Sequence, residues 1–571
     1  MQSPRRYFSA HVAAPAACAG VSILVRGIAY FFYRQSPLLN PPEGSVHDRS
    51  IYQSAIDLVA SGTFFPEGAF DYLPLYPWLM GIFSIFAGSG PAAIATFGIA
   101  CDAATTACIF LLARRLGAKP VLCGLAALAY AFYPLAVVYS LLSMPNTLNA
   151  LCVTGFALTV QYVIDRNHHH VAGKRSAHKA MFGLGFYAGV TTLGFAGMLM
   201  MASVAALILA IKLRMWSVVL AFAFGMAIPI APVAIHNSRA EGQVVLLTTH
   251  GGLNFYMGNH ELATGYPLRI RDFRMSAKHL LEDAHRYAED RSGRTLSRAE
   301  SSAWWSGEAR QFWREHPLFG IVLSAKKVAL FWNQIDVDDL RVLEQLKITE
   351  SAFRNWIGVP FAVFGILGLT GLLLAQKSGV HKIMLLAGMI GLVMFFITAR
   401  YRLTFVPLMA VLGAVGLSDV GALWRSHHRV KLIVVMPILV LVFFPVPLRD
   451  LRPVDHYNAA IQLMATGQID KALIVITRGL KIDPEFADLH FARGNLLFRR
   501  EDFKGAVEAY AQALLRNPNN PTAIFNFALS MARSGDICGA RDALLEMQAR
   551  RMPIDDRARR LLADLNASCE E

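Results

Sequence analysis

A short polar segment near the N-terminus carries the first side chain able to do acid–base chemistry. Asp48 lies there, after His47 and four residues before Tyr52, and the segment is flanked by apolar stretches. A carboxylate at the water side of a membrane is well placed to take the proton of an acceptor hydroxyl. The alternative is an ordinary solvated aspartate, which residue type alone favours.

Two arginines could stabilise a phosphate. Arg400 and Arg402 flank Tyr401 at the junction of two apolar segments. A guanidinium can bind a phosphate through two hydrogen bonds, and it can offset charge that develops on a leaving phosphate. The alternative is the positively charged end of a span. We favour phosphate binding, because outward-facing arginines run against the positive-inside rule and so indicate an anionic partner.

A third polar segment contains the glycine pair Gly251-Gly252, followed by Asn254 and Asn259. The pair can present backbone N–H groups to a ligand, or it can turn the chain tightly and position the segment. The asparagine amides can hydrogen-bond to sugar or phosphate oxygens. Both interpretations of the glycine pair stay open.

The elements that position these residues must lie largely in a membrane. Of 571 residues, 55% are hydrophobic and 16% are charged, and the mean hydropathy is +0.41, which exceeds what a soluble core of this size needs. The net charge of +14 (54 − 40) sits mostly in short loops, as the positive-inside rule produces, and does not indicate a nucleic-acid partner. The cysteines show no disulfide framework and no metal motif.

The apolar pattern predicts an all-α polytopic membrane domain over 1–450 with about 11–12 spans. The apolar segments are 11–33, 74–88, 91–113, 120–139, 141–164, 180–194, 196–213, 216–236, 356–375, 381–399, 402–421 and 430–447. Placing the basic loops in the cytoplasm puts 34–73, 237–355 and everything after 448 outside a bacterial inner membrane. Only one of the segments 74–88 and 91–113 can then cross the membrane, because 34–73 lies outside and the basic loop after residue 113 lies in the cytoplasm. Segment 74–88 therefore has the wrong parity for a span, and we expect it to dip into the membrane or lie at its surface.

The long outer insertion 237–355 contains a stretch that mixes apolar residues with Lys326 and Lys327. We expect Phe319 to Trp332 to form an amphipathic helix on the membrane surface.

After Pro453 the composition changes to that of a soluble helical repeat. Pro484 and Pro518 are 34 residues apart, and small residues and an aromatic residue recur at the same period. This spacing predicts an α-solenoid of three tetratricopeptide repeats over 453–571, which start near residues 453, 487 and 521. Such repeats bind proteins or peptides, or they simply orient a neighbouring domain.

Several motifs in order along the chain resemble the GT-C membrane glycosyltransferases, specifically the family of protein mannosyltransferases and aminoarabinose transferases. The resemblance rests on Asp48 with Tyr52, Tyr72-Leu73-Pro74-Leu75-Tyr76-Pro77, Asn237-Ser238-Arg239, the segment from His250 to Asn259, His316-Pro317, Phe331-Trp332-Asn333 and Arg400-Tyr401-Arg402-Leu403. It runs discontinuously to about residue 420 and leaves out the repeats.

This resemblance implies inverting transfer of a sugar from a polyprenyl-phosphate donor, at the outer face, to a protein, lipid or glycan hydroxyl. Asp48 matches the family's first-loop acid and would be the general base. Arg400, Tyr401 and Arg402 would bind the donor phosphate. The loop residues His47, Tyr52, Asn237, Gly251, Gly252, Asn254 and Asn259 would contact donor or acceptor.

Three positions depart from the family pattern. Arg49 replaces a second acid, the segment Ser143 to Thr147 lacks another, and His236 replaces an arginine. Hard divalent cations prefer carboxylate oxygens, so the missing acids disfavour a bound metal, and no other cofactor is expected.

Two other function classes remain as alternatives. A non-catalytic membrane scaffold would recruit partners through the repeats. A secondary transporter would suit the many spans and Asp102, an acid within an apolar segment. For Asp102 we expect a buried hydrogen-bonded role. For Arg26 in the first span we expect a side chain that extends to the membrane surface, and the alternative is that it approaches a lipid phosphate.

Overall fold

The computed structural model describes residues 4–36, 39, 48–168, 174–267, 277–336, 338–350, 358–425, 441–443, 452–550, 552 and 554–569. These residues form α-helices and no β-strand, which confirms the all-α prediction. They make up two compact units. The first lies within 1–34, 45–340 and 357–446, and the second lies within 35–44, 341–356 and 447–571.

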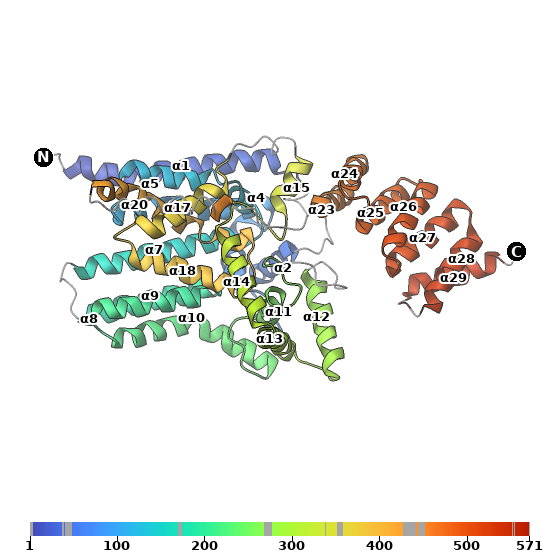
Figure 1. Ribbon diagram of the computed structural model, residues 1–571, viewed down its shortest axis with the longest axis horizontal. Helices are drawn as coiled ribbons and strands as arrows, with labels where there is room; N and C mark the ends of the chain where they lie inside the picture. Colours follow the sequence, from blue (N-terminus) through green and yellow to red (C-terminus); the bar gives the residue numbers. More distant parts are fainter. Residues whose placement is uncertain are drawn as a thin grey trace. The chain divides into compact units, whose positions relative to one another are not determined.

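The first unit is a bundle of apolar helices. Four of its described helices are long and apolar enough to cross a bilayer, judged by length and composition: α1 (Pro4–Tyr33), α4 (Pro91–Arg115), α7 (Asn146–His168) and α10 (Ser217–Glu241). Shorter apolar helices are α3 (Leu75–Ala87), α5 (Pro120–Ala131), α9 (Met198–Leu213), α17 (Phe361–Leu374), α18 (Gly379–Val393) and α20 (Val406–Arg425). With α8 (Lys174–Thr192), most of them run side by side (Figure 1).

A polytopic helical membrane protein is therefore confirmed. The exact number of spans stays a prediction, because most of the last expected segment, 430–447, lies outside the described residues.

Two of the expected segments are broken. Segment 120–139 divides into α5 and α6 (Pro134–Tyr139), since Pro134 lacks a backbone N–H and cannot continue the preceding helix. Segment 381–399 ends at Val393, and a separate short helix, α19 (Ala399–Leu403), follows. The Thr398 side chain accepts a hydrogen bond from the Arg400 backbone N–H and so caps the start of α19.

The helices of the two predicted outer loops, called here the outer-loop helices, gather at one end of this bundle (Figure 1). They are α2 (Asp48–Ala60), α11 (Gly251–Gly258), α12 (Ala277–Ser292), α13 (Arg298–Glu315) and α14 (Pro317–Trp332). The thirteen-residue α3, from the segment with the wrong parity, packs against α2. These helices, rather than the long spans, supply most of the candidate site.

Helix α14 differs from the expected amphipathic helix in one respect. Leu318, Ile321 and Val322 are exposed, so an apolar face is available to a membrane surface. Lys327, however, is fully buried and donates to Asn259 Oδ1 at 3.1 Å. Burial lowers the pKa of this lysine to about 8.

The second unit contains the predicted repeats as antiparallel helix pairs. They are α23 (Arg452–Ala465) with α24 (Ile469–Ile482), α25 (Ala487–Arg499) with α26 (Phe503–Arg516), and α27 (Pro521–Ser534) with α28 (Ile537–Ala549). A last helix, α29 (Asp556–Cys569), packs on the third pair. The aromatic Tyr510 packs against Gly494, which is the pairing of bulky and small residues that the repeat pattern requires.

One helix from the outer insertion also belongs to this second unit. Helix α15 (Val342–Thr349) packs on α23. Its residue Ile348 packs against an apolar cluster formed by buried side chains of α23, α24 and α25. Arg341 makes two hydrogen bonds of 2.6 Å to the Asp455 carboxylate. No pattern in the sequence predicted this association.

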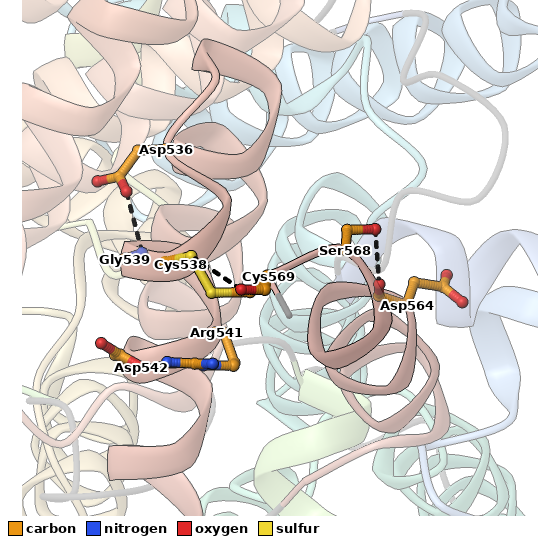
Figure 2. Close-up of a disulfide and its surroundings, with 8 residues drawn as sticks. All are labelled: Asp536, Cys538, Gly539, Arg541, Asp542, Asp564, Ser568 and Cys569. Atoms are coloured by element: carbon orange, nitrogen blue, oxygen red, sulfur yellow. Dashed lines mark hydrogen bonds and ion pairs between the residues drawn. A yellow bond between two sulfur atoms is a disulfide. The ribbon is translucent and has the colours of Figure 1, made fainter. Parts of the chain in front are cut away.

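A disulfide joins Cys538 on α28 to Cys569 on α29 (Figure 2). It closes a loop of 31 residues and fastens the last helix to the third repeat. Two cysteines among seven form no recognisable spacing, so the sequence did not reveal this bond. The remaining cysteines are free, and Cys18, Cys101, Cys123 and Cys152 are buried in apolar helices, as expected for small hydrophobic residues.

Candidate active site

A cavity of about 750 Å³ opens among the outer-loop helices of the first unit. Helices α2, α11, α12 and α13 contribute to its wall, together with the segments before α3 and α11 and the short helix α19. Cavities of this size hold small to medium ligands and mark the default binding site of an enzyme. A candidate residue is therefore expected to reach this cavity if it contacts donor or acceptor.

Four of the residues singled out from sequence line this cavity: Tyr52, Asn254, Arg400 and Tyr401. They come from three chain segments that are far apart in sequence. The helix that carries Tyr52 begins at Asp48, and its neighbour Ile51 also faces the cavity. The side chain of Asp48 and the whole of His47 lie outside the described residues, so their roles stay predictions.

Arg400 is held firmly at the cavity wall. Its guanidinium lies 2.6 Å from Asp339 Oδ2 and 5.0 Å from the centre of the Tyr401 ring. Thr398 Oγ1 donates to the other Asp339 oxygen at 2.9 Å, and Asn146 Nδ2 donates to the Arg400 carbonyl at 2.9 Å. A guanidinium has five N–H donors, so it can bind a carboxylate and a phosphate together.

Arg402 is placed differently, away from the cavity lining. It is 1% exposed, and it donates to the carbonyl oxygens of Leu330 at 2.9 Å and Asn333 at 2.8 Å. It also pairs with Asp336 at 2.6 Å and lies over the Phe361 ring. These contacts give Arg402 a structural role, and its predicted contact with the donor phosphate is not retained.

Asn237 and Asn259 are also buried away from the cavity lining. Asn237 accepts from the Phe70 backbone N–H at 2.9 Å and donates to the Leu247 carbonyl at 2.8 Å. Asn259 accepts from Trp313 Nε1 at 3.1 Å as well as from Lys327. Their amides hold the outer-loop segments together, so we do not retain a direct contact with donor or acceptor for either residue.

The glycine pair allows two helices to come close. A Cβ on Gly252 would lie 1.7 Å from the Ser302 carbonyl oxygen, and the Gly252 N–H donates to Ser302 Oγ at 2.9 Å. Gly251 has open space around it. The geometry favours the positioning interpretation for Gly252, since its contact with α13 orients α11 and brings Asn254 to the cavity.

Sequence reasoning missed a second charged group in the same wall, made by Asp71, His250 and Arg298. Asp71 Oδ1 lies 2.8 Å from Arg298 Nη1 and 3.4 Å from His250 Nε2. Burial opposes ionisation of Asp71, but the hydrogen bonds and charges of His250 and Arg298 outweigh it and lower its pKa. Its position just before Tyr72, at the exit of the first outer loop, was the signal that could have identified it.

Buried charges within the bundle pair with each other. Arg26 is fully buried and lies 2.7 Å from Asp102, whose other oxygen accepts from Tyr130 at 2.7 Å. The expectation that Arg26 extends to the membrane surface is wrong, because Asp102 and the Ala131 carbonyl satisfy its guanidinium inside the protein. Asp102 has the expected buried, hydrogen-bonded role.

The described residues of the cavity do not make a convincing metal site. No group of three or more His, Cys, Asp or Glu side chains in the described part is arranged to hold a metal ion. Asp71 and Asp339 each pair with an arginine instead.

Three comparisons relate the chain to known proteins. The Tetratricopeptide repeat family model matches residues 487–520, which confirms the repeat predicted to start near residue 487. No curated protein shows a significant match.

Two solved structures of the Archaeoglobus fulgidus oligosaccharyltransferase are similar to the chain. One is a complex with Zn and sulfate, at 15% identity and a TM-score of 0.35, over 78% of this chain and 54% of that chain. The other is tethered through a disulfide to an acceptor peptide containing the NVT sequon, at 13% identity and a TM-score of 0.36, over 81% of this chain and 59% of that chain. Both similarities cover less than two thirds of the oligosaccharyltransferase chain.

Proposed function

We propose that the protein is a glycosyltransferase that moves a sugar from a polyprenyl-phosphate donor to a hydroxyl group of a protein, lipid or glycan. The observation that carries this proposal is the meeting of α2, which begins at Asp48, and Arg400 at one cavity. A base and a phosphate-binding cation are the two groups that this transfer needs. The family resemblance of the same segments supports the same chemistry.

The proposed reaction is a single displacement with inversion. Asp48 takes the proton of the acceptor hydroxyl as its oxygen forms a bond to the anomeric carbon. The bond from that carbon to the phosphate oxygen breaks, and the polyprenyl phosphate leaves with the electron pair. Arg400 binds the phosphate and stabilises the charge that develops there, while Asp339 and Tyr401 keep the guanidinium in place.

We further infer that the cavity and the repeats face the same oxidising compartment. Helix α15 comes from the insertion between α14 and α17, yet it shares a compact unit with the repeats that follow the last span. Helices that pack against each other outside the bilayer must lie on the same side of the membrane. The Cys538–Cys569 disulfide supports the extracytoplasmic side, because disulfides persist in oxidising compartments.

A transfer assay with a radiolabelled polyprenyl-phosphate sugar tests the function. Purified protein in detergent is given three acceptors in separate reactions: Ser- and Thr-containing peptides, an alkyl glycoside and a lipid with a free hydroxyl. We expect wild-type protein to transfer label to at least one of them and Asp48→Asn to lose about 10²–10⁴-fold in rate. The matched control is Asp57→Asn, an exposed carboxylate on the same helix.

Equal rates for wild-type protein and Asp48→Asn would remove Asp48 from the mechanism. An absence of both transfer and donor hydrolysis by wild-type protein would favour the scaffold alternative.

A further inference from the structure

We propose that Asp71, His250 and Thr249 form the acceptor subsite of the cavity, where the Asp71 carboxylate accepts a hydrogen bond from an O–H or N–H group of the acceptor that lies beside the hydroxyl receiving the sugar. This inference rests on the proposed function and adds Asp71 and Thr249, which the family resemblance does not include. Asp71 acts as a binding and orienting group, and Asp48 remains the proposed base.

The first observation is the geometry of the Asp71 carboxylate. Its contacts with Arg298 Nη1 and His250 Nε2 both use Oδ1. Oδ2 engages no hydrogen-bond or ion-pair partner among the described residues. The side chain lines the cavity and is 36% exposed, so this second oxygen is available to accept a hydrogen bond from a ligand.

The second observation is a buried hydroxyl beside it. Thr249 directly precedes His250, lines the same cavity and is 4% exposed. Its Oγ1 has no hydrogen-bond partner in the described part of the chain. A buried hydroxyl is normally hydrogen-bonded, so a ligand with polar groups is expected to complete this one. A sugar or peptide acceptor carries several such groups.

The third observation is that rigid elements fix the subsite. Phe70, next to Asp71, donates its backbone N–H to the buried Asn237 side chain. Arg298 is the first residue of α13, whose start is fixed by a capping box between Ser297 and Glu300. His250 precedes α11, whose packing against α13 depends on Gly252. The carboxylate is therefore held in place before any acceptor arrives, which reduces the entropy lost on binding.

The ordinary alternative is that the Asp71–Arg298 pair only ties α13 to the first outer loop. The two roles make opposite predictions for an exchanged pair. A purely structural ion pair should be restored in the double variant Asp71→Arg with Arg298→Asp. An acceptor subsite should not be restored, because the carboxylate then projects from a different element.

The experiment measures how the labelled donor divides between the acceptor probe and water. We expect Asp71→Asn to raise the apparent KM for the acceptor about tenfold while the donor KM and the rate of donor hydrolysis stay unchanged. The control Asp57→Asn should match wild type in both. Thr249→Val, which keeps the side-chain shape, should also raise the acceptor KM and covers the case in which Asp71→Asn does not fold.

Three outcomes would overturn the inference. One is a wild-type acceptor KM in both Asp71→Asn and Thr249→Val. Another is recovery of the wild-type KM in the exchanged pair. The third is donor hydrolysis by wild-type protein with no transfer to any probe, which would leave water as the only acceptor. If wild-type protein neither transfers nor hydrolyses the donor, the proposed function fails first and the subsite fails with it.

Discussion

Two arginines separated by one residue have different surroundings in this protein. Arg400 lines the cavity and pairs with Asp339, whereas Arg402 is enclosed by backbone carbonyls and Asp336. Side chains at positions i and i+2 of a helix point in different directions, so α19 can present only one of the two to a ligand. The sequence identified the motif but not which arginine faces the cavity.

This difference can be tested with matched substitutions. We expect Arg400→Gln to leave the protein folded and to lower the transfer rate about 10²–10³-fold, since a phosphate-stabilising cation is lost. Arg402→Gln should instead destabilise the fold by ~3 kcal/mol, because it leaves the half-buried Asp336 without its charge partner. Transfer rates and apparent melting temperatures of both variants in detergent measure the contrast. A folded Arg402→Gln with the larger catalytic defect would reverse the assignment.

Asp71 shows why part of the site could not be taken from the sequence. Its partners His250 and Arg298 lie about 180 and 230 residues further along the chain, and no local pattern links them. By contrast, Asp48, Asn254 and Arg400 lie in motifs whose order is readable, and the structure brings α2, Asn254 and Arg400 to one cavity.

At the level of single elements, apolar run length predicted most of the bundle helices. Pro134 gave a local signal for the break between α5 and α6. The 34-residue spacing of Pro484 and Pro518 located the repeats. The association of α15 with α23 had no such signal, because Arg341 and Asp455 are 114 residues apart. The inward direction of Lys327 was also missed, since its helix has apolar residues on both faces.

Lys327 makes the stability of the outer-loop helices depend on pH. Its pKa is about 8 in the folded protein and close to 10.5 when unfolded, so the unfolded state binds more protons between these values. Stability should therefore rise as the pH increases from about 8 to 10. We expect Lys327→Met to raise the apparent melting temperature at pH 7 and to abolish this rise, while Lys326→Met has the smaller effect.

A lower melting temperature for Lys327→Met at pH 7 would show that the hydrogen bond to Asn259 outweighs the cost of burying the ammonium group.

The Arg341–Asp455 pair is expected to hold α15 to the repeats. The Asp455 side chain is almost fully buried, and burial raises its pKa even though Arg341 counteracts this. Arg341→Ala should destabilise the second unit by ~3 kcal/mol, because the carboxylate is left without its partner. Limited proteolysis of the full-length protein should then cleave the repeats faster. The exposed pair Lys347–Glu344 offers a control, and Lys347→Ala should change little.

At the scale of the whole molecule, the side of the membrane that holds the repeats can be measured in intact cells. In a variant that keeps only Cys538 and Cys569, an impermeant maleimide should label neither residue until an impermeant reductant is added. Labelling that appears only after the cells are permeabilised, without any reductant, would place the repeats in the cytoplasm. It would then also move the cavity to that side, because α15 shares their unit.

The central claim is that the donor sugar binds in the cavity where α2, α11 and α19 meet. A polyprenyl-phosphate donor with a photoreactive sugar, irradiated with the full-length protein and mapped by mass spectrometry, tests this claim most directly. We expect adducts at or next to Tyr52, Asn254 and Tyr401. Adducts confined to the repeats, or to the loop between α4 and α5, would contradict it.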